Sequence, residues 1–204
     1  VLAPGLLSLV GIAIVAPELR SEFLSKDLSI GGLGLLLALA YACGHVVQAL
    51  GNALECFWWK AWKGDPSDWL RTGAHEVVAD SQRSAFLARL TGAEPKDGAG
   101  PLVSATAWAA VMRQAAARIR TAGRGQRLDA FNRSLGANRG FAISGLVAAV
   151  ACLSNDACSG WIAGALFACT AGCWARMDRY CRNYTRELVG QYLECVPPGD
   201  ATRT

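Results

Sequence analysis

"IGGLGLLLALAYACGHVVQALGNALE", residues 30–55, is an apolar stretch that carries a polar stripe. Residues 30–50 contain no Asp, Glu, Lys or Arg and match the length of a transmembrane helix, about 20 residues. Because a helix turns about 100° per residue, the polar positions of this stretch fall within roughly 80° of one another. These positions are Tyr41, His45, Gln48, Asn52 and Glu55.

Three further apolar stretches, residues 1–16, 140–153 and 160–175, resemble membrane spans. The first is short, and a signal peptide is its alternative interpretation, because "AIVAPE" offers small residues. The last two are separated only by "SNDACSG" and predict a hairpin of tilted or locally thinned spans, or a buried hairpin in a soluble core. No alternating β pattern appears. The sequence predicts an all-α transmembrane protein with four spans and a helical cytoplasmic region.

Basic residues predict the orientation of the spans. Residues 55–139 hold thirteen Lys and Arg and residues 176–204 hold five, whereas the connector 17–29 has two and the loop 154–159 has none. Basic residues concentrate on the cytoplasmic side of a membrane. Both termini are therefore expected in the cytoplasm. The predicted regions are spans one and two (1–55), an Arg-rich helical cytoplasmic region (56–139), a transmembrane hairpin (140–175) and a cytoplasmic helical extension with a tail (176–204).

Local patterns also predict the cytoplasmic helices. Tyr180, Tyr184 and Tyr192 recur with helical spacing after span four, so one helix of up to about 36 residues should run through span four and beyond. It should end before Pro197-Pro198. The other predicted elements are helices at 75–90, 102–120 and 127–139, the last running on into span three, a loop at 91–101 and a break at 123–126.

Residues 57–72 hold four tryptophans among charged residues. Aromatic side chains of this kind favour the membrane interface, so the segment predicts an aromatic belt at the inner end of span two. An aromatic core of the soluble part is the alternative. "GDPSD", residues 64–68, predicts a turn within the segment.

Small residues recur at every fourth position of span four, at Gly160, Gly164, Ala168 and Gly172. Residues 140, 144, 148 and 152 of span three are also small. Such spacing lets helix backbones approach closely in lipid. It predicts close packing either within the hairpin or between chains of a homo-oligomer, for which a tetramer is our expectation.

The eight cysteines do not form a secreted disulfide framework. Only Cys152 and Cys158, which flank the loop between spans three and four, are placed to form a bridge if that loop faces an oxidising space. The spacing of Cys and His predicts neither a metal site nor a cofactor. The sequence contains no catalytic motif, so we do not expect an enzyme.

Seven arginines with a single acid, Asp129, occupy residues 113–139. One interpretation is attraction to the anionic inner leaflet, about 1 kcal/mol per basic residue. The other is a site for the phosphates of a nucleotide or a single-stranded DNA oligomer, because the planar guanidinium binds phosphate in bidentate fashion and Trp or Tyr can stack on bases. The candidate ligand-binding residues are Arg113, Arg118, Arg120, Arg124, Arg127, Arg133 and Arg139.

The polar stripe also has two interpretations. Its side chains can hydrogen-bond to a neighbouring helix and only stabilise the bundle. Alternatively, because polar residues within a membrane tend to face a water-filled path, they can line a pore, with Glu55 favouring cations at its inner mouth. One small chain with one stripe cannot enclose a pore, so the second interpretation requires an oligomer.

Three segments, "AYACGHVVQALGNALE" (40–55), "LDAFNRSLGANRGFA" (128–142) and "RYCRNYTRELVGQYL" (179–193), together resemble small bacterial membrane proteins encoded in anti-phage defence loci, in particular the membrane effectors of Hailong systems. The resemblance implies a bacterial inner-membrane channel that short DNA oligomers, made by a partner nucleotidyltransferase, hold shut. Loss of the oligomer would then depolarise the cell. It makes the arginine cluster the candidate oligomer site and the stripe of residues 41–55 the candidate ion path.

We therefore expect an oligomeric inner-membrane ion channel gated by a nucleotide or oligonucleotide and acting in antiviral defence. A non-conducting membrane anchor, whose basic cytoplasmic part recruits a protein or nucleic acid, is the alternative. A small transporter is disfavoured because the sequence shows no inverted repeat.

Overall fold

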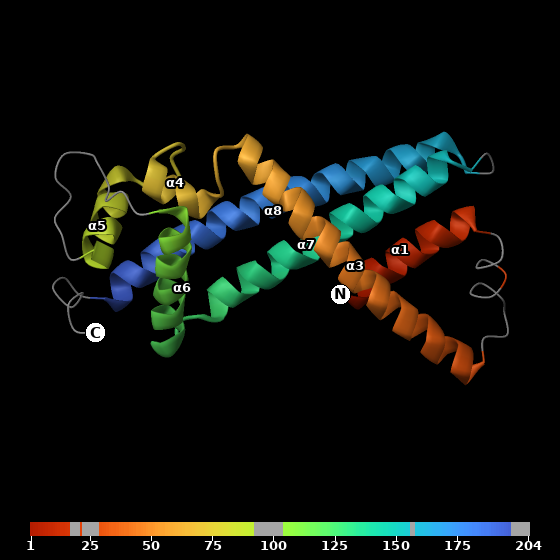
Figure 1. Cartoon of the computed structure of the whole chain (residues 1–204), viewed down its shortest axis with the longest axis horizontal. Coiled ribbons are helices and arrows are strands. Elements are labelled where there is room, and N and C mark those ends of the chain that lie inside the picture. The colour runs from red at the N-terminus through yellow and green to blue at the C-terminus, as the bar shows by residue number, and fades with distance from the viewer. Residues whose placement is uncertain (17–20, 22–28, 92–103, 156–157, 197–204) are drawn as a thin grey trace. The chain divides into compact units, whose positions relative to one another are not determined.

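The chain folds into α-helices (Figure 1). The computed structural model describes residues 1–16, 21, 29–91, 104–155 and 158–196, and these contain no strand. The prediction of an all-α fold is thus confirmed. Most of the connector 17–29, most of the loop at 91–101 and Pro197-Pro198 lie outside the described residues. The helices are α1 (Leu2–Val15), α3 (Ile30–Ala61), α4 (Pro66–Thr72), α5 (Asp80–Thr91), α6 (Ala105–Thr121), α7 (Gln126–Leu153) and α8 (Gly160–Cys195).

The helices group into two compact units. Unit 1 comprises Val1–Phe57 and Ser134–Asp178, and unit 2 comprises Trp58–Arg133 and Arg179–Thr204. The sequence-based boundaries were 55/56, 139/140 and 175/176, whereas the structural ones are 57/58, 133/134 and 178/179. The largest difference assigns residues 134–139, including Arg139, to unit 1.

Small residues line the helix contacts of unit 1. A Cβ atom at Gly11 of α1 would lie 2.8 Å from the Cα atom of Ala148 on α7, so the two backbones nearly touch there. Beside this contact, the buried Ser8 hydroxyl donates to Ser144 Oγ at 3.0 Å, and the Ser144 hydroxyl donates to the Pro4 carbonyl at 2.7 Å. Close backbone approach with interhelical hydroxyl bonds is typical of helices packed in lipid.

Large apolar side chains lie on the surface of unit 1. Among the described residues, every exposed large hydrophobic side chain except Trp62 belongs to this unit, and Leu35, Val46 and Phe57 are 59%, 60% and 69% exposed. Two helical stretches of the described chain, Ile30–Thr72 and Gln126–Leu153, are long and apolar enough to cross a membrane, whereas α1 is apolar but shorter. Of the four predicted spans, the second and third thus meet this measure, whereas the first and the fourth do not.

Unit 2 has an aromatic and aliphatic core. Phe86 of α5 packs edge-to-face on Tyr192 of α8, with ring centroids 5.3 Å apart, and both residues are 0% exposed. Trp108, Ile119 and Leu188 are buried in the same cluster. Helices α5, α6 and α8 supply most of this core, and Leu128 adds the first turn of α7.

Polar side chains fix the ends of the helices in unit 2. Asp65 caps α4 by accepting from the backbone N–H groups of Ser67 at 2.7 Å and Asp68 at 3.0 Å. Arg83 binds the other end of α4, where its Nε donates to the Leu70 carbonyl at 2.6 Å. Gly73 follows α4 with a φ of 69°, a left-handed conformation that glycine adopts without steric cost.

Several helix predictions agree with the structure. Helix α7 runs without interruption from Gln126 to Leu153, and α8 contains 36 residues, as the sequence predicted. The break at 123–126 is also confirmed, because α6 ends at Thr121, Gly123 has a φ of 74° and α7 begins at Gln126.

The predicted helix over 75–90 starts too early, because α5 begins only at Asp80. Tertiary contacts hold the preceding residues in another conformation: the His75 ring packs on Trp69 at 4.5 Å between centroids, and Arg186 Nε donates to the Val77 carbonyl at 2.8 Å. The tryptophans of residues 57–72 differ in burial. Trp59 and Trp69 are buried in unit 2, whereas Trp62 is 42% exposed.

Candidate functional site

The polar stripe of α3 divides into two edges in unit 1. Gln48 and Glu55 are largely buried and point toward α7, whereas Tyr41, His45 and Asn52 are exposed. Helical geometry explains the division, because positions 48 and 55 lie to one side of position 41 and positions 45 and 52 lie to the other, each by about 20° to 40°. We call Gln48 and Glu55 the inner edge, and Tyr41, His45 and Asn52 the outer edge.

The inner edge binds Arg139 of α7. Arg139 Nη1 forms an ion pair and hydrogen bond with Glu55, and Nη2 donates to Gln48 Oε1 at 3.3 Å. Gln48 Nε2 in turn donates to the Gly136 carbonyl at 3.2 Å. The Arg139 and Glu55 side chains are 18% and 16% exposed, so the pair is mostly shielded from solvent.

Gly51 makes room for this contact. A Cβ atom at Gly51 would lie 2.8 Å from Arg139 Cγ and 3.2 Å from Cδ, so the stem of Arg139 crosses α3 at the position where α3 has no side chain. Gly51 itself is buried. Gly51 was not among the predicted site residues. Its place between Gln48 and Glu55 on the same turns of α3 is nevertheless a sequence signal of a close helix contact.

The outer edge lies among apolar side chains. Tyr41 and His45 form an edge-to-face pair with ring centroids 4.5 Å apart, and Asn52 is exposed about two turns further along α3. Val46 and Leu50, on the same stretch of helix, are 60% and 52% exposed. The outer edge is therefore a line of polar groups among the exposed apolar side chains of residues 30–55 of α3.

The arginine cluster is largely paired with acceptors in unit 2. Arg120 binds Asp129 through Nε at 3.0 Å and Nη2 at 2.9 Å. Arg118 Nη1 donates to the Tyr192 hydroxyl at 3.2 Å. Two ion pairs join residues distant in sequence, Arg124 with Glu194 and Arg127 with Glu187 at 3.4 Å. Helix α8 thus supplies two acids that the sequence window did not contain.

Three arginines of the predicted site differ from these four. Arg113 and Arg133 are exposed, and neither pairs with a described residue. Arg139 belongs to unit 1, where it binds Glu55 of the other predicted site.

Tyr184 lies beside the Arg120–Asp129 pair. Burial raises the pKa of the Tyr184 hydroxyl, and Asp129 adds to the rise while Arg120 opposes it.

The small-residue stripe of α8 does not form the contact between α7 and α8. Gly160, Gly164 and Gly172 have no atom within 4 Å of the place of a Cβ atom, and Ala168 is exposed. The hairpin packs instead at Gly145, where a Cβ atom would lie 2.6 Å from Thr170 Oγ1. The small residues of α7 at 140 and 148 face α1 and α3, next to Pro4, Gln48 and Gly11.

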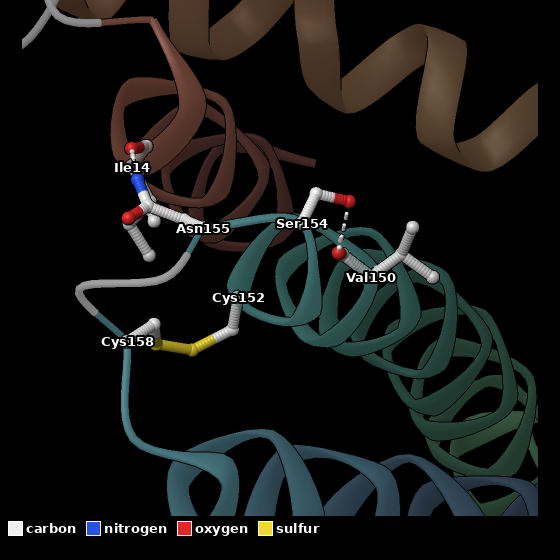
Figure 2. The surroundings of a disulfide bond; sticks show 6 residues. All are labelled: Ile14, Val150, Cys152, Ser154, Asn155 and Cys158. Carbon is white, nitrogen blue, oxygen red and sulfur yellow. Dashed lines mark hydrogen bonds between the residues drawn. A yellow bond between two sulfur atoms is a disulfide. The ribbon is translucent and has the colours of Figure 1, made fainter.

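A disulfide between Cys152 and Cys158 closes the loop that joins α7 to α8 (Figure 2). Next to the bridge, Asn155 Nδ2 donates to the Ile14 carbonyl at 2.6 Å, near the end of α1. The loop therefore holds the end of α1 as well as the two helices that it connects. The sequence indicated the pairing of the cysteines but not the role of Asn155.

Unit 2 also contains a cavity of about 160 Å³ between α4 and α5. Its lining includes Trp69, His75, Glu76, Asp80 and Arg83. The Arg182 guanidinium lies over the Trp69 ring, 4.7 Å from its centroid. Because carboxylates and a guanidinium line the cavity together, its charge does not select one class of ligand. Within the described residues, no group of three or more His, Cys, Asp or Glu side chains could hold a metal ion.

No protein-family model, no curated protein and no solved structure matches the chain.

Proposed function

We propose that the chain is one subunit of an oligomeric ion channel in the bacterial inner membrane. The proposal has four spans: α1, the apolar part of α3, the part of α7 after residue 139, and α8 up to residue 175. Unit 2 and both termini lie in the cytoplasm, and the loop with the Cys152–Cys158 bridge lies on the oxidising side. The bridge supports this orientation, because thiols in the cytosol stay reduced.

The outer edge of the stripe carries the proposal. Its exposed Tyr41, His45 and Asn52 lie on a stretch of α3, residues 30–55, whose other exposed side chains are apolar. Polar groups that face lipid are costly, so in a membrane they face water or another protein surface. A second copy of the chain supplies that surface, and a ring of copies places the outer edges around an aqueous path.

Gating by an anionic ligand is the second part of the proposal. Arg113 and Arg133 are exposed without a described partner, and the paired arginines at 120, 124 and 127 make exposed or partly exposed ion pairs. Such pairs contribute about 0–1 kcal/mol each, so a ligand with several phosphates can displace the carboxylates at small cost. The resemblance to Hailong effectors suggests a short single-stranded DNA oligomer that holds the channel closed.

The test is ion flux from liposomes that contain the purified chain, with and without short single-stranded DNA. We expect flux in the absence of DNA and its suppression when DNA is added. Flux that DNA does not alter would rule out gating of the channel by DNA. Absence of flux under both conditions, with insertion of the protein verified, would rule out channel function itself.

Two variants locate the path. His45→Leu/Asn52→Leu changes only the outer edge and leaves the contacts of Gln48 and Glu55 intact, so it should abolish most of the flux. Ala53→Leu is the matched control, because residue 53 is exposed on the same turn but apolar.

A second set of variants tests the ligand site. Arg113→Ala/Arg133→Ala should weaken DNA binding and reduce its salt dependence, whereas Arg179→Ala, at another exposed arginine of unit 2, should not.

A non-conducting membrane anchor is the second candidate. The inner edge favours it, because Gln48 and Glu55 are satisfied within the chain by Arg139 and the Gly136 carbonyl, as bundle-stabilising residues would be. In this case His45→Leu/Asn52→Leu should leave the binding of unit 2 to DNA or to a partner unchanged, and neither variant nor wild type should conduct.

A further inference from the structure

The two cysteines of the bridge in unit 1 differ in their access to solvent (Figure 2). Cys152 belongs to the last turn of α7 and is 1% exposed. One turn earlier on the same side of α7, Ala148 packs against Gly11 of α1. Cys158 precedes α8 and is partly exposed. Cys152 thus lies within the helix packing, whereas Cys158 is open to a reagent from outside.

We propose that Cys158 is the exchange site of the bridge, the sulfur that reacts first with a disulfide-bearing oxidant, and that Cys152 closes the bridge afterwards. Thiol–disulfide exchange requires a thiolate to reach a sulfur atom, so its rate depends on access. The inference uses the proposed position of the loop on the oxidising side, and it is independent of ion conduction.

The reaction consists of two exchange steps. The Cys158 thiolate attacks one sulfur of the oxidant's disulfide; that bond breaks, a mixed disulfide forms, and the other sulfur leaves as a thiolate. The Cys152 thiolate then attacks Cys158 Sγ and expels the oxidant's remaining sulfur. Two electrons pass from the cysteines to the oxidant, and the two protons of the cysteine thiols end on the oxidant's two sulfurs. A dithiol reductant reverses both steps and attacks Cys158 first.

Asn155 positions Cys158 for the second step. The backbone N–H of Cys158 donates to the Asn155 carbonyl at 2.9 Å, and the Asn155 side chain donates to the Ile14 carbonyl of α1 at 2.6 Å. The Cα atoms of Cys152 and Cys158 are 5.4 Å apart. Because Asn155 is bound to α1, it holds Cys158 beside the buried cysteine, so the attack that closes the bridge occurs within an ordered site.

The test is the reaction of the purified, reduced chain in detergent micelles with oxidised glutathione, followed by acid quenching and mass spectrometry of its peptides. In Cys152→Ala, glutathione should accumulate on Cys158. In Cys158→Ala, its attachment to Cys152 should be at least about tenfold slower. The exposed Cys56, present in both variants, is the internal reference. Equal rates, or a faster reaction at Cys152, would overturn the inference.

Two further measurements show whether burial causes the difference. In denaturant, the two single-cysteine rates should agree within about twofold, because unfolding exposes both thiols. A difference that survives unfolding would contradict the assignment to burial. Wild type quenched during oxidation needs no substitution, so it also covers variants that fold poorly. Its transient mixed disulfide should be on Cys158, and its presence on Cys152 would reverse the proposed order.

A third pair of variants tests Asn155. Asn155→Ala should leave the first step unchanged and slow the conversion of the mixed disulfide into the bridge by about two- to tenfold, the effect of one hydrogen bond. Ser154→Ala is the matched control, because the Ser154 hydroxyl donates only within the end of α7, to the Val150 carbonyl at 3.0 Å. Equal closing rates in the two variants would exclude Asn155 from the second step.

These outcomes are separate from those of the channel proposal. The exchange reactions are measured without ion flux, so a chain that does not conduct leaves the order of the two cysteines intact. Conversely, a chain that conducts but reacts first at Cys152 keeps the channel and loses the exchange site.

Discussion

Unit 2 encloses Trp69, Phe86 and Tyr192, whereas unit 1 displays its leucines, valines and phenylalanines and fills its interior mostly with alanine, glycine and serine. In water, burial of large apolar side chains drives folding, and unit 2 follows this rule. In lipid, that driving force between helices is absent, and close contact of small residues replaces it. The two units of one chain thus have the interiors expected for two different solvents.

The largest expected effect tests the interior of unit 2. Phe86→Ala removes a fully buried ring that packs on Tyr192, and it should destabilise unit 2 by about 3–5 kcal/mol. Unfolding in denaturant, followed by tryptophan fluorescence, measures the loss. Phe57→Ala is the matched control, because Phe57 is 69% exposed in unit 1. Equal destabilisation by both would contradict the contrast between the units.

The interior of unit 1 should respond to added volume instead. Gly11→Val would place side-chain atoms against the backbone of Ala148, and such overpacking should cost about 1–3 kcal/mol. Thermal unfolding in detergent micelles is the measurement. Gly34→Val, where a Cβ atom meets nothing within 4 Å, should leave the midpoint unchanged. If both valines were tolerated equally, close helix contact would not be what holds unit 1 together.

A helix cap in unit 2 should contribute less than its core. Asp65→Ala removes the acceptor of two backbone N–H groups at the start of α4 and should cost about 1 kcal/mol. The same unfolding experiment measures it. Asp65→Asn keeps an acceptor oxygen and should recover most of the loss, so equal effects of the two variants would exclude capping as the cause.

The smallest effect at neutral pH is expected for Tyr184→Phe. Burial raises the pKa of the Tyr184 hydroxyl in the folded state, so the folded state holds this proton more tightly than the unfolded state. The corresponding stability is present below the ordinary tyrosine pKa of about 10 and is lost as the pH rises through the folded-state pKa. Wild type should therefore lose more stability than Tyr184→Phe under alkaline conditions, measured by unfolding across that pH range. Parallel pH profiles would contradict the assignment.

Features that depend on neighbouring residues were predictable from the sequence. The break at 123–126 follows from two glycines, and the continuous helices α7 and α8 follow from long periodic stretches without proline. The amphipathic stripe of α3 was likewise visible as spacing. The start of α5 was not, because the packing of His75 on Trp69 overrides the local helical pattern.

The candidate sites depend on contacts between distant residues, and there the sequence was less informative. Arg139 and Glu55 are 84 positions apart, and nothing in either segment indicates that they meet. Glu187 and Glu194 of α8 pair with Arg127 and Arg124, so the apparent excess of positive charge over 113–139 is partly balanced by acids far along the chain. Charge counted along a window therefore overestimates charge at a surface.

The bridge between Cys152 and Cys158 also distinguishes chains whose membrane insertion is complete from chains whose insertion is not. In the orientation proposed above, a newly made chain carries both thiols until the loop between α7 and α8 has crossed the bilayer, and only then does an oxidant meet them. The bond is thus a chemical record of completed insertion. Two thiols titrated in a denatured sample, beyond the six of the other cysteines, would reveal chains whose hairpin stalled on the way.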